Sequence, residues 1–407
     1  MKELVLWISS FFALLISLFW IQVMYFKDAK TEVTNKFPKV TILIPAYNEE
    51  KTIAKTINSV LNLDYPKDKI EIIVINDNST DKTSQVVRKF KQVKLVYNKH
   101  RGVGKASALN TGLKYASGEL LAVIDADSEV KKDSLKKLIN YFNDTKTGSV
   151  ISSIKIRNPK NIYEHIQRLE YILATFIRKL MSKIDTLHIT PGVLSVYRTD
   201  LIKKLGGFDE NNITEDLEIA LRLRANNYSV KMSSDSITYT KVPSTFKQLW
   251  NQRIRWFRGF IFNNLKYKKM FMNKKYGLMG KFQLPLNALT FFTIIALFIV
   301  IAYEVITQLY ELIFRLFLLK SNIIYSLNLN FPSLKELLLS TNIKLFFPLT
   351  VSFLLSFYLL NKAHKSMNEK LILNPALLLY FTVYPVLRTL HWMTAFYKEV
   401  IQTKRKW

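Results

Sequence analysis

The residues Leu-Leu-Ala-Val-Ile-Asp-Ala-Asp-Ser at positions 120–128 decide the fold of this chain, because an apolar run ends there at two carboxylates. Alternate residues of an extended strand share a face, so Asp125 and Asp127 point the same way at the end of a predicted strand. Paired hard oxygen ligands suit Mg²⁺ or Mn²⁺. The same residues would also serve to end a strand and cap the next helix, and this stretch alone leaves both interpretations open.

Short apolar strands alternate with helical patterns on both sides of this stretch, from Lys39 to about Lys241. Strands that are apolar along their whole length are typical of a parallel sheet covered on both faces. The sequence therefore predicts an α/β fold with a doubly wound, Rossmann-like sheet, which binds ligands at the carboxyl ends of its strands. Strands are predicted at 40–44, 70–75, 94–97 and 120–124, and helices at 51–63, 82–91 and 105–116.

Polar segments follow three of these strands, at 45–50, 76–81 and 125–127. The carboxyl ends of parallel strands meet at one edge of a sheet, so these segments are expected to lie close together. Further along, the chain is predicted to form a strand at 150–156, a long helix at 162–184, a turn into a strand at 190–195 and a helix opening at 214–216.

The first and last parts of the chain are apolar enough for a membrane. Residues 4–26 are long enough to span a bilayer, and Lys27 and Lys30 follow directly. The positive-inside rule then places the amino terminus outside and the following domain in the cytoplasm. Further spans are predicted at 286–305 and 346–360. These segments predict a multi-pass protein of the cell membrane.

The segment 371–397 is long enough to cross as well, but it contains Pro385, Arg388 and His391. A broken helix, a hairpin or a span that lines a polar cavity would each accommodate them. Four crossings would leave the basic residues 404–406 outside, so a further crossing or a re-entrant element is expected within 306–345 or 371–397.

Composition limits the classes of function. Among 407 residues, Lys and Arg number 59 and Asp and Glu 31, a formal net charge of +28. Such a charge suits nucleic acid, anionic lipid or anionic substrates such as nucleotide sugars, and we favour membrane adhesion over nucleic acid because much of it lies near the apolar segments. Cysteine is absent, which excludes disulfides, zinc–thiolate sites and a cysteine nucleophile.

Five short motifs occur in a specific order: Pro-Ala-Tyr-Asn-Glu at 45–49, Asn-Asp-Asn-Ser-Thr-Asp at 76–81, Asp-Ala-Asp at 125–127, Thr-Glu-Asp at 214–216 and Gln-Arg-Ile-Arg-Trp at 252–256. With this set the chain resembles membrane-integrated family 2 glycosyltransferases, such as poly-N-acetylglucosamine and cellulose synthases. The resemblance covers roughly residues 40–260. It implies a membrane anchor and linker at 1–38, a GT-A-type catalytic domain at 39–245, interfacial amphipathic helices at 246–284 and a transmembrane region at 285–407.

The resemblance implies a donor site at the strand ends. Asp127 matches the direct ligand of Mg²⁺ or Mn²⁺, and Asp125 matches a contact to the ribose or to the metal through water. Asp77 matches the acid that binds uracil, although a helix cap would explain it equally. Residues 47–49 and 105 complete this predicted site: Tyr47, Asn48 and Glu49 contact the nucleotide, and Lys105, after a Gly-rich turn at 102–104, supplies a cation for the diphosphate.

The resemblance also implies the catalytic base and the acceptor contacts. Asp216 matches the base that deprotonates the acceptor hydroxyl, while capping of a helix start is the ordinary local explanation. Gln252, Arg255 and Trp256 share one helix face, where Arg255 matches a diphosphate clamp and Trp256 an acceptor platform. A basic-aromatic helix on a membrane surface would explain the same segment. Gly192, with the proline before it, is a weaker acceptor-site candidate.

These features predict a processive, inverting enzyme that polymerises a β-linked polysaccharide from a UDP-sugar and helps to export it. The Asp216-Leu217 pair looks closer to poly-N-acetylglucosamine and cellulose synthases than to hyaluronan synthases, so UDP-GlcNAc is the expected donor. Only about four spans are predicted, which is few for a pore that conducts a polysaccharide. We therefore expect an accessory membrane subunit or a homo-oligomer. A non-processive transferase that glycosylates a membrane lipid, a hyaluronan- or cellulose-type synthase, and a membrane-tethered binding protein are the alternatives.

Overall fold

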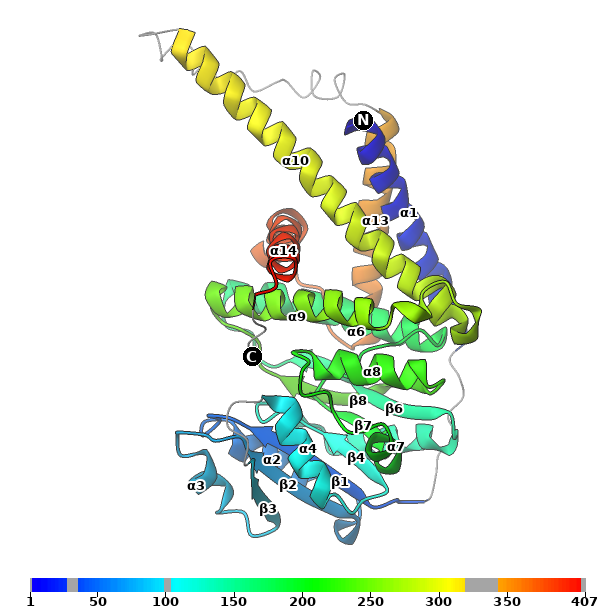
Figure 1. The fold of residues 1–407 in the computed structure, drawn as a ribbon, viewed down its shortest axis with the longest axis vertical. Coiled ribbons are helices and arrows are strands. Elements are labelled where there is room, and N and C mark those ends of the chain that lie inside the picture. Colours follow the sequence, from blue (N-terminus) through cyan, green and yellow to red (C-terminus); the bar gives the residue numbers. More distant parts are fainter. Residues whose placement is uncertain (1, 28–35, 99–103, 319–342, 404–407) are drawn as a thin grey trace. The chain divides into compact units, whose positions relative to one another are not determined.

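The computed structural model describes residues 2–27, 36–98, 104–318 and 343–403 (Figure 1). These residues form two compact units. The first comprises residues 1–24 and 286–362, and the second comprises residues 25–285 and 363–407. The second unit contains the sheet and every residue predicted for the site.

An eight-stranded sheet forms the centre of the second unit, in the order β3-β2-β1-β4-β7-β6-β8-β5. The bounds are β1 Val40–Ala46, β2 Ile70–Asn76, β3 Val93–Tyr97, β4 Leu120–Val123, β5 Glu129–Val130, β6 Thr147–Ile156, β7 Ser195–Arg198 and β8 Ser229–Thr240. The half formed by β3, β2, β1 and β4 is parallel, as predicted. The other half is mixed, because β7 runs antiparallel to both β4 and β6, and β5 runs antiparallel to β8.

The prediction of an α/β fold is therefore confirmed, and the predicted parallel sheet is found for β3, β2, β1 and β4 but does not extend to the other half. Strand β7 comes after the helix at 162–183 and a loop, and it runs antiparallel to both of its neighbours in the sheet. Its residues are as buried as those of a parallel strand, and apolar content alone does not distinguish the two directions.

Helices cover both faces of the parallel half, which explains why its strands are apolar at every position. Ile42 and Ile44 of β1 join the core cluster of α2, whereas Leu43 faces Gly112 of α4 together with Ile75 of β2. The helices of the sheet domain are α2 Ile53–Leu61, α3 Thr83–Val87, α4 Lys105–Tyr115, α5 Ser134–Ile139, α7 Thr199–Lys204 and α8 Glu215–Ala225.

Three longer helices complete the second unit: α6 (Ile162–Lys183), α9 (Phe246–Lys266) and α14 (Pro375–Val400). Helix α6 lies on β6 and β8, and α14 packs on both α6 and α9 (Figure 1). Asn374 caps α14 by accepting a hydrogen bond from the backbone N–H of Leu377, with Pro375 in the first turn. The segment predicted as a broken helix, a hairpin or a span is thus one continuous helix, which accommodates Pro385.

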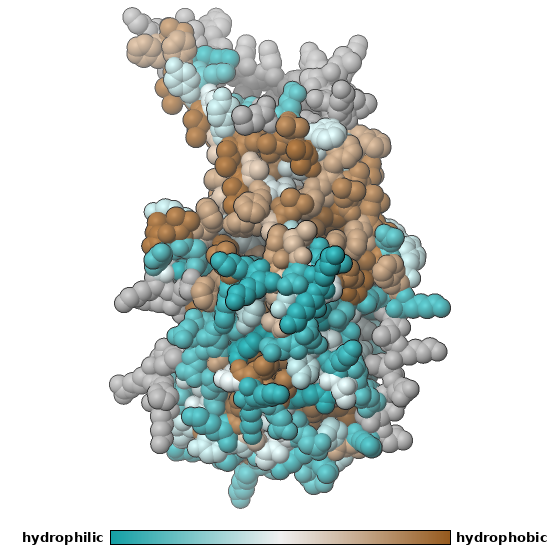
Figure 2. All heavy atoms as spheres, turned by 45° about the vertical axis from the view of Figure 1, so that its right-hand side comes forward, coloured by the Kyte–Doolittle hydropathy of each residue, from teal (hydrophilic) through white to brown (hydrophobic). Residues whose placement is uncertain are grey.

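The first unit is helical, with α1 (Lys2–Met24), most of α10 (Leu284–Leu318) and most of α13 (Ile343–Ser366). Among the described residues, two helices are long and apolar enough to cross a membrane, Glu3–Met24 and Met279–Arg315. On the face drawn in Figure 2, hydrophobic side chains gather over the helical unit, and the surface of the sheet domain is mainly hydrophilic. The predicted basic tail at 404–406 and most of the segment 306–345 predicted to hold a further crossing lie outside the described residues.

Candidate active site

The predicted nucleotide contacts lie at the carboxyl ends of β1 and β2. Asp77 follows β2, and its Oδ1 accepts a hydrogen bond of 2.8 Å from the side-chain amide of Asn98, which follows β3. Burial raises the pKa of Asp77, and the bond from Asn98 partly offsets that rise. Tyr47 follows β1, and its side chain is 60% exposed, so a flat aromatic face is available beside this carboxylate.

Two loops at this edge are joined by side chain-to-backbone hydrogen bonds. Asn48 has a φ of +55°, and its Oδ1 accepts a bond of 2.8 Å from the N–H of Thr80. The backbone N–H groups of Asn48 and Glu49 donate to the hydroxyls of Ser79 and Thr83, at 3.0 and 2.8 Å. Asn48 and Glu49 thus hold the β1–α2 loop against the β2–α3 loop, which keeps Tyr47 and Asp77 at one edge.

Lys105 lies at the centre of the candidate site. Its Nζ forms an ion pair with Asp125 and lies 3.3 Å from Oε1 of Glu215 at the start of α8. Burial opposes the charge of Lys105, but these two carboxylates outweigh burial and raise its pKa. The carbonyl of Gly192 accepts a bond of 2.7 Å from the N–H of Asp125, and a Cβ at Gly192 would lie only 2.6 Å from Asp125 Oδ1. A side chain at Gly192 would therefore displace the Lys105–Asp125 ion pair, which glycine leaves undisturbed.

Asp216 lies beside this centre in the first turn of α8. Its backbone carbonyl accepts a bond of 2.7 Å from the hydroxyl of Thr190, and its own Oδ1 accepts a bond of 2.9 Å from the N–H of Leu217. Burial raises the pKa of Asp216, and the charges of Lys105 and Arg255 partly offset the rise. A carboxylate with a raised pKa is a stronger base than a solvated one, which suits proton abstraction.

Asp127 is largely buried beside other carboxylates, which disfavours its ionised form. Burial, Asp125 and Glu49 together raise the pKa of Asp127 to about 7. In the described part of the chain, no group of three or more Asp, Glu or His side chains is placed to hold a metal ion. Mg²⁺ and Mn²⁺ are commonly bound by one or two carboxylates together with phosphate and water oxygens. The excess of carboxylate charge at Asp125 and Asp127 therefore fits a divalent cation that is completed by a substrate.

Helix α9 brings the Gln-x-x-Arg-Trp residues to the same unit. The Nη1 of Arg255 donates a bond of 3.2 Å to the carbonyl of Ile213, three residues before Asp216. The indole of Trp256 lies 6.5 Å, centroid to centroid, from the ring of Tyr171 in α6. Gln252 accepts a hydrogen bond from Arg253, its neighbour along the chain. Arg255 is thus placed near the candidate base, while Trp256 faces an aromatic partner.

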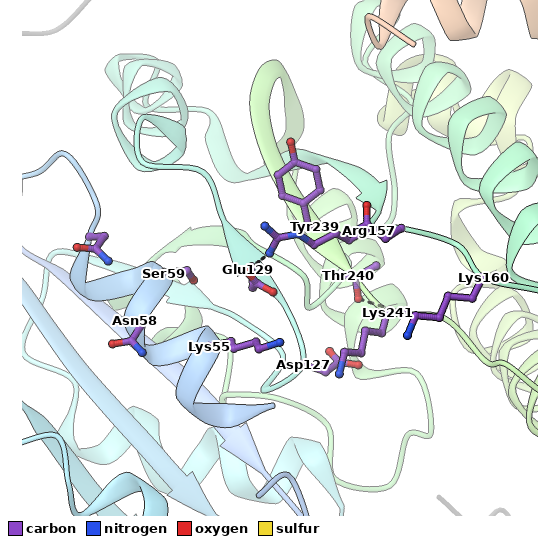
Figure 3. Close-up of a pocket in the computed structure, with 12 residues that line it drawn as sticks. Lys55, Asn58, Ser59, Asp127, Glu129, Arg157, Lys160, Tyr239, Thr240 and Lys241 are labelled. Carbon is purple, nitrogen blue, oxygen red and sulfur yellow. Dashed lines mark hydrogen bonds and ion pairs between the residues drawn. The ribbon is translucent and has the colours of Figure 1, made fainter. Parts of the chain in front are cut away.

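A basic cavity of about 770 Å³ opens beside Asp127 (Figure 3). Lys55 of α2 points toward Asp127 from one side, and Lys160 and Lys241 approach from the opposite side. Arg157, which also lines the cavity, is paired with Glu129. Three cations from separate elements therefore surround one carboxylate, an arrangement that suits an anionic ligand able to bridge a metal and ammonium groups.

The structure thus forms one centre at Asp77 and Tyr47 and another at Lys105, Asp125 and Asp216. The predicted residues Gln252 and Trp256 contact Arg253 rather than either centre. Two residues that contact these centres, Asn98 and Glu215, are not among those predicted from the sequence, and Gly192, a weaker acceptor-site candidate, lies against the Lys105–Asp125 ion pair. A largely buried lysine such as Lys105 needs carboxylate partners to stay charged, and this need was the available signal for Glu215. Residues 102 and 103 of the Gly-rich turn lie outside the described residues.

Comparisons with known proteins identify a family and several similar sequences. Residues 41–206 match the model of glycosyl transferase family 2. The chain is 33% identical over 296 residues to the probable glycosyltransferase YdaM of Bacillus subtilis, covering 66% of this chain and 70% of that protein. It is 34% identical over 228 residues to a poly-beta-1,6-N-acetyl-D-glucosamine synthase of Staphylococcus epidermidis, and the match spans 54% of each chain.

A solved structure shares the fold across nearly the whole chain. The mannosyltransferase PcManGT of Pyrobaculum calidifontis, in complex with GDP-Man and Mn²⁺, superposes with a TM-score of 0.66 at 20% identity, covering 99% of this chain and 100% of that one. The predicted GT-A-type fold is thereby confirmed.

The raised pKa of Asp127 predicts how metal-free protein responds to pH. Because the folded pKa of about 7 exceeds the ordinary value of 3.8, the native state retains a proton that the unfolded state loses. The free energy of unfolding should therefore fall as pH rises from about 4 to about 7. Substitution Asp127→Asn should remove the contribution of this carboxylate, which makes the slope shallower, and should raise the melting temperature at about pH 8. Chemical denaturation across this pH range, in the presence of a chelator, measures the effect. Equal slopes of the free energy of unfolding against pH for wild type and variant would contradict this prediction.

Proposed function

Because the chain belongs to glycosyl transferase family 2, we propose that this glycosyltransferase moves a sugar from a UDP-sugar, best fitted by UDP-GlcNAc, onto a growing β-linked polysaccharide. The observation that carries the proposal is the contact of Lys105 with both Asp125 and Glu215. Glu215 begins α8, and Asp216 is the next residue of that helix. This centre offers a cation for a diphosphate and a buried base within one cluster. The name of the Staphylococcus epidermidis relative supports GlcNAc as the sugar.

In the proposed reaction, Asp216 accepts the proton of the acceptor hydroxyl as that oxygen attacks the anomeric carbon. Its raised pKa makes it a better base, and the nearby charges of Lys105 and Arg255 keep enough of it ionised to act. A single displacement from the face opposite UDP inverts the anomeric carbon, so an α-linked donor gives a β-linked product. Asp216 remains protonated until the product leaves.

The donor is held by its nucleoside and by its diphosphate. Asp77, kept in place by Asn98, would accept a hydrogen bond from uracil, and Tyr47 would lie against the base. Lys105 and Arg255 would bind the diphosphate, and Asp127 with Asp125 would hold Mg²⁺ or Mn²⁺. When bound, the metal neutralises charge on the leaving diphosphate as a Lewis acid.

The three lysines around the basic cavity support an anionic donor. Lys55, Lys160 and Lys241 line the cavity that reaches Asp127 (Figure 3). A cavity lined by charges of one sign raises the local concentration of an oppositely charged substrate and its rate of association. We assign the cavity to entry of the nucleotide diphosphate.

Two further parts of the proposal, the contacts to the acceptor sugar and the location of the enzyme, are based on the helices. We propose that Trp256 and Gln252 contact the acceptor sugar, and that α1 and α10 anchor the enzyme in the cell membrane with the sheet domain in the cytoplasm. Domain limits at 38, 245 and 284 are part of this proposal. Export of the product, with an accessory membrane subunit or a second copy of the chain, would follow if the enzyme is processive. Transfer of one sugar to a membrane lipid is the second candidate, since such an acceptor would also approach from the membrane side.

A donor screen tests the proposal directly. Purified protein in detergent or nanodiscs is incubated with each radiolabelled UDP-sugar, with Mg²⁺, Mn²⁺ or a chelator, and the product is separated by size. We expect UDP-GlcNAc with metal to give long chains that a β-hexosaminidase degrades. A product carrying a single sugar on lipid would refute the polymerase and support the lipid alternative.

Loss of the candidate base should abolish chemistry and leave binding intact. Substitution Asp216→Asn preserves the shape of the residue but removes its proton affinity, so kcat should fall by about 10²–10⁴-fold. The dissociation constant of UDP, measured by calorimetry, should change little. Asp200→Asn, at an exposed position in the first turn of α7, serves as a control for loss of a carboxylate at a helix start. Transfer by Asp216→Asn at near wild-type rate would overturn the mechanism.

Neutralising the rim of the basic cavity should slow capture of the donor. The double substitution Lys55→Gln and Lys160→Gln should raise the KM for the UDP-sugar several-fold at low ionic strength, with kcat unchanged, because screening and charge removal act on association. The difference from wild type should shrink as salt rises to about 0.3 M. The pair Lys89→Gln and Lys91→Gln removes the same charge from exposed positions outside the cavity. An equal effect of both pairs would show that only net charge matters.

A further inference from the structure

One carboxylate oxygen joins three helices of the second unit. Oε2 of Glu170 in α6 accepts a hydrogen bond of 2.5 Å from Nη2 of Arg253 in α9. The same oxygen accepts a bond of 2.7 Å from the hydroxyl of Tyr384 in α14. Nε of Arg253 lies 3.4 Å from that hydroxyl, which closes the triangle. Tyr384 is separated from Glu170 by 214 positions along the chain, so the contact depends on the tertiary fold.

This cluster directly contacts two residues of the Gln-x-x-Arg-Trp segment. The guanidinium carbon of Arg253 lies 4.3 Å from the centroid of the Trp256 indole, a cation–π distance. The Nη1 of Arg253 donates to Oε1 of Gln252. Arg253 itself is not one of the residues predicted for the site. It nevertheless fixes the amide of Gln252 and supports one face of Trp256.

The burial of the cluster makes its geometry rigid. The side chain of Arg253 is only 1% exposed and that of Glu170 is 15% exposed. Burial would raise the pKa of Glu170, but the charge of Arg253 outweighs burial and lowers it, so both groups are ionised. A guanidinium with fixed partners on Nε, Nη1 and Nη2 has no rotational freedom, and it presents one orientation to the indole.

A buried ion pair is rarely the most stable way to join helices, because apolar side chains of similar volume would pack as well. A charged cluster instead fixes orientation, because each hydrogen bond sets the orientation of the group that it contacts. In this cluster Arg253 orients Gln252 and Trp256. Both residues belong to α9, which also carries Arg255 near the candidate base.

From this geometry we propose that Glu170, Arg253 and Tyr384 are positioning residues for the sugar acceptor, and that α14 thereby supports the acceptor subsite from behind Arg253. The proposal rests on the proposed function, in which Gln252 and Trp256 contact the acceptor. Tyr384 fixes Glu170, Glu170 fixes Arg253, and Arg253 holds the indole and the amide in the orientation that a sugar ring meets. Misplacement of an acceptor by a fraction of its diameter is sufficient to reduce transfer strongly.

The test separates acceptor use from donor chemistry. For wild type and Tyr384→Phe, transfer of GlcNAc to a soluble GlcNAc oligosaccharide, hydrolysis of UDP-GlcNAc by water and binding of UDP are measured side by side. Because the acceptor loses orientation and the donor does not, the KM for the oligosaccharide should rise about tenfold. Hydrolysis and the dissociation constant of UDP should stay within about twofold of wild type.

The control is Tyr380→Phe, one turn earlier on α14, where the ring stacks on Tyr384 with centroids 5.9 Å apart. It removes a hydroxyl from the same helix that lies outside the hydrogen-bonded cluster, and it should leave all three measurements near wild type. Glu170→Gln should act like Tyr384→Phe, and the double variant should lose no more than the stronger single variant, because both break one chain of contacts. Melting temperatures of all variants establish that they are folded.

Equal loss of transfer, hydrolysis and UDP binding in Tyr384→Phe would mean that the cluster only holds the fold together, and would overturn the inference. The same would follow if Tyr384→Phe behaved like Tyr380→Phe while wild type used the oligosaccharide normally. If wild type transferred GlcNAc to no sugar acceptor at all, the proposed function would fail, and this inference with it.

Discussion

The candidate site depends on one ammonium group. Lys105 lies between Asp125, which follows β4 in the parallel half of the sheet, and Glu215, which begins α8, the helix that packs on β8 of the mixed half. Without the lysine, two buried carboxylates would repel each other and each would carry an uncompensated cost of desolvation. With it, the two halves of the sheet domain are joined where the donor's diphosphate is proposed to bind. Gly192 has no side chain because the loop that carries it passes directly over this ion pair.

Much of the parallel half could be predicted from the sequence, because strand and helix alternate there with clear periodicity and polar segments mark the strand ends. The direction of β7 could not, since an antiparallel strand that is buried on both faces has the same apolar pattern as a parallel one. Strand pairing in that half is decided by contacts between distant segments. The helix at 375–400 was ambiguous for a related reason: its polar residues face partners on α6 and α9 that no local pattern reveals.

The residue types of the site were predictable where a motif marked them, as at Asp125, Asp216 and Trp256. The residues that hold those side chains in place were not. Asn98 follows a short strand and has no motif, and its role appears only when its amide is seen to reach Asp77. Arg253 occupies an unassigned position of the Gln-x-x-Arg-Trp segment, although it contacts both ends of the motif. Partners of this kind are set by packing, so a single sequence contains little trace of them.

The second unit is discontinuous, since the chain leaves it after residue 285 and returns at residue 363. This has a consequence for biosynthesis. As the polypeptide emerges from the ribosome, the sheet and α9 are complete long before α14 exists, and the charged pair of Glu170 and Arg253 must wait for the hydroxyl of Tyr384. Contacts so distant in sequence form slowly. The apolar surfaces of α6 and α9 that α14 covers are therefore exposed in the nascent chain for the time needed to make the intervening helices, which is when the protein is most vulnerable to aggregation.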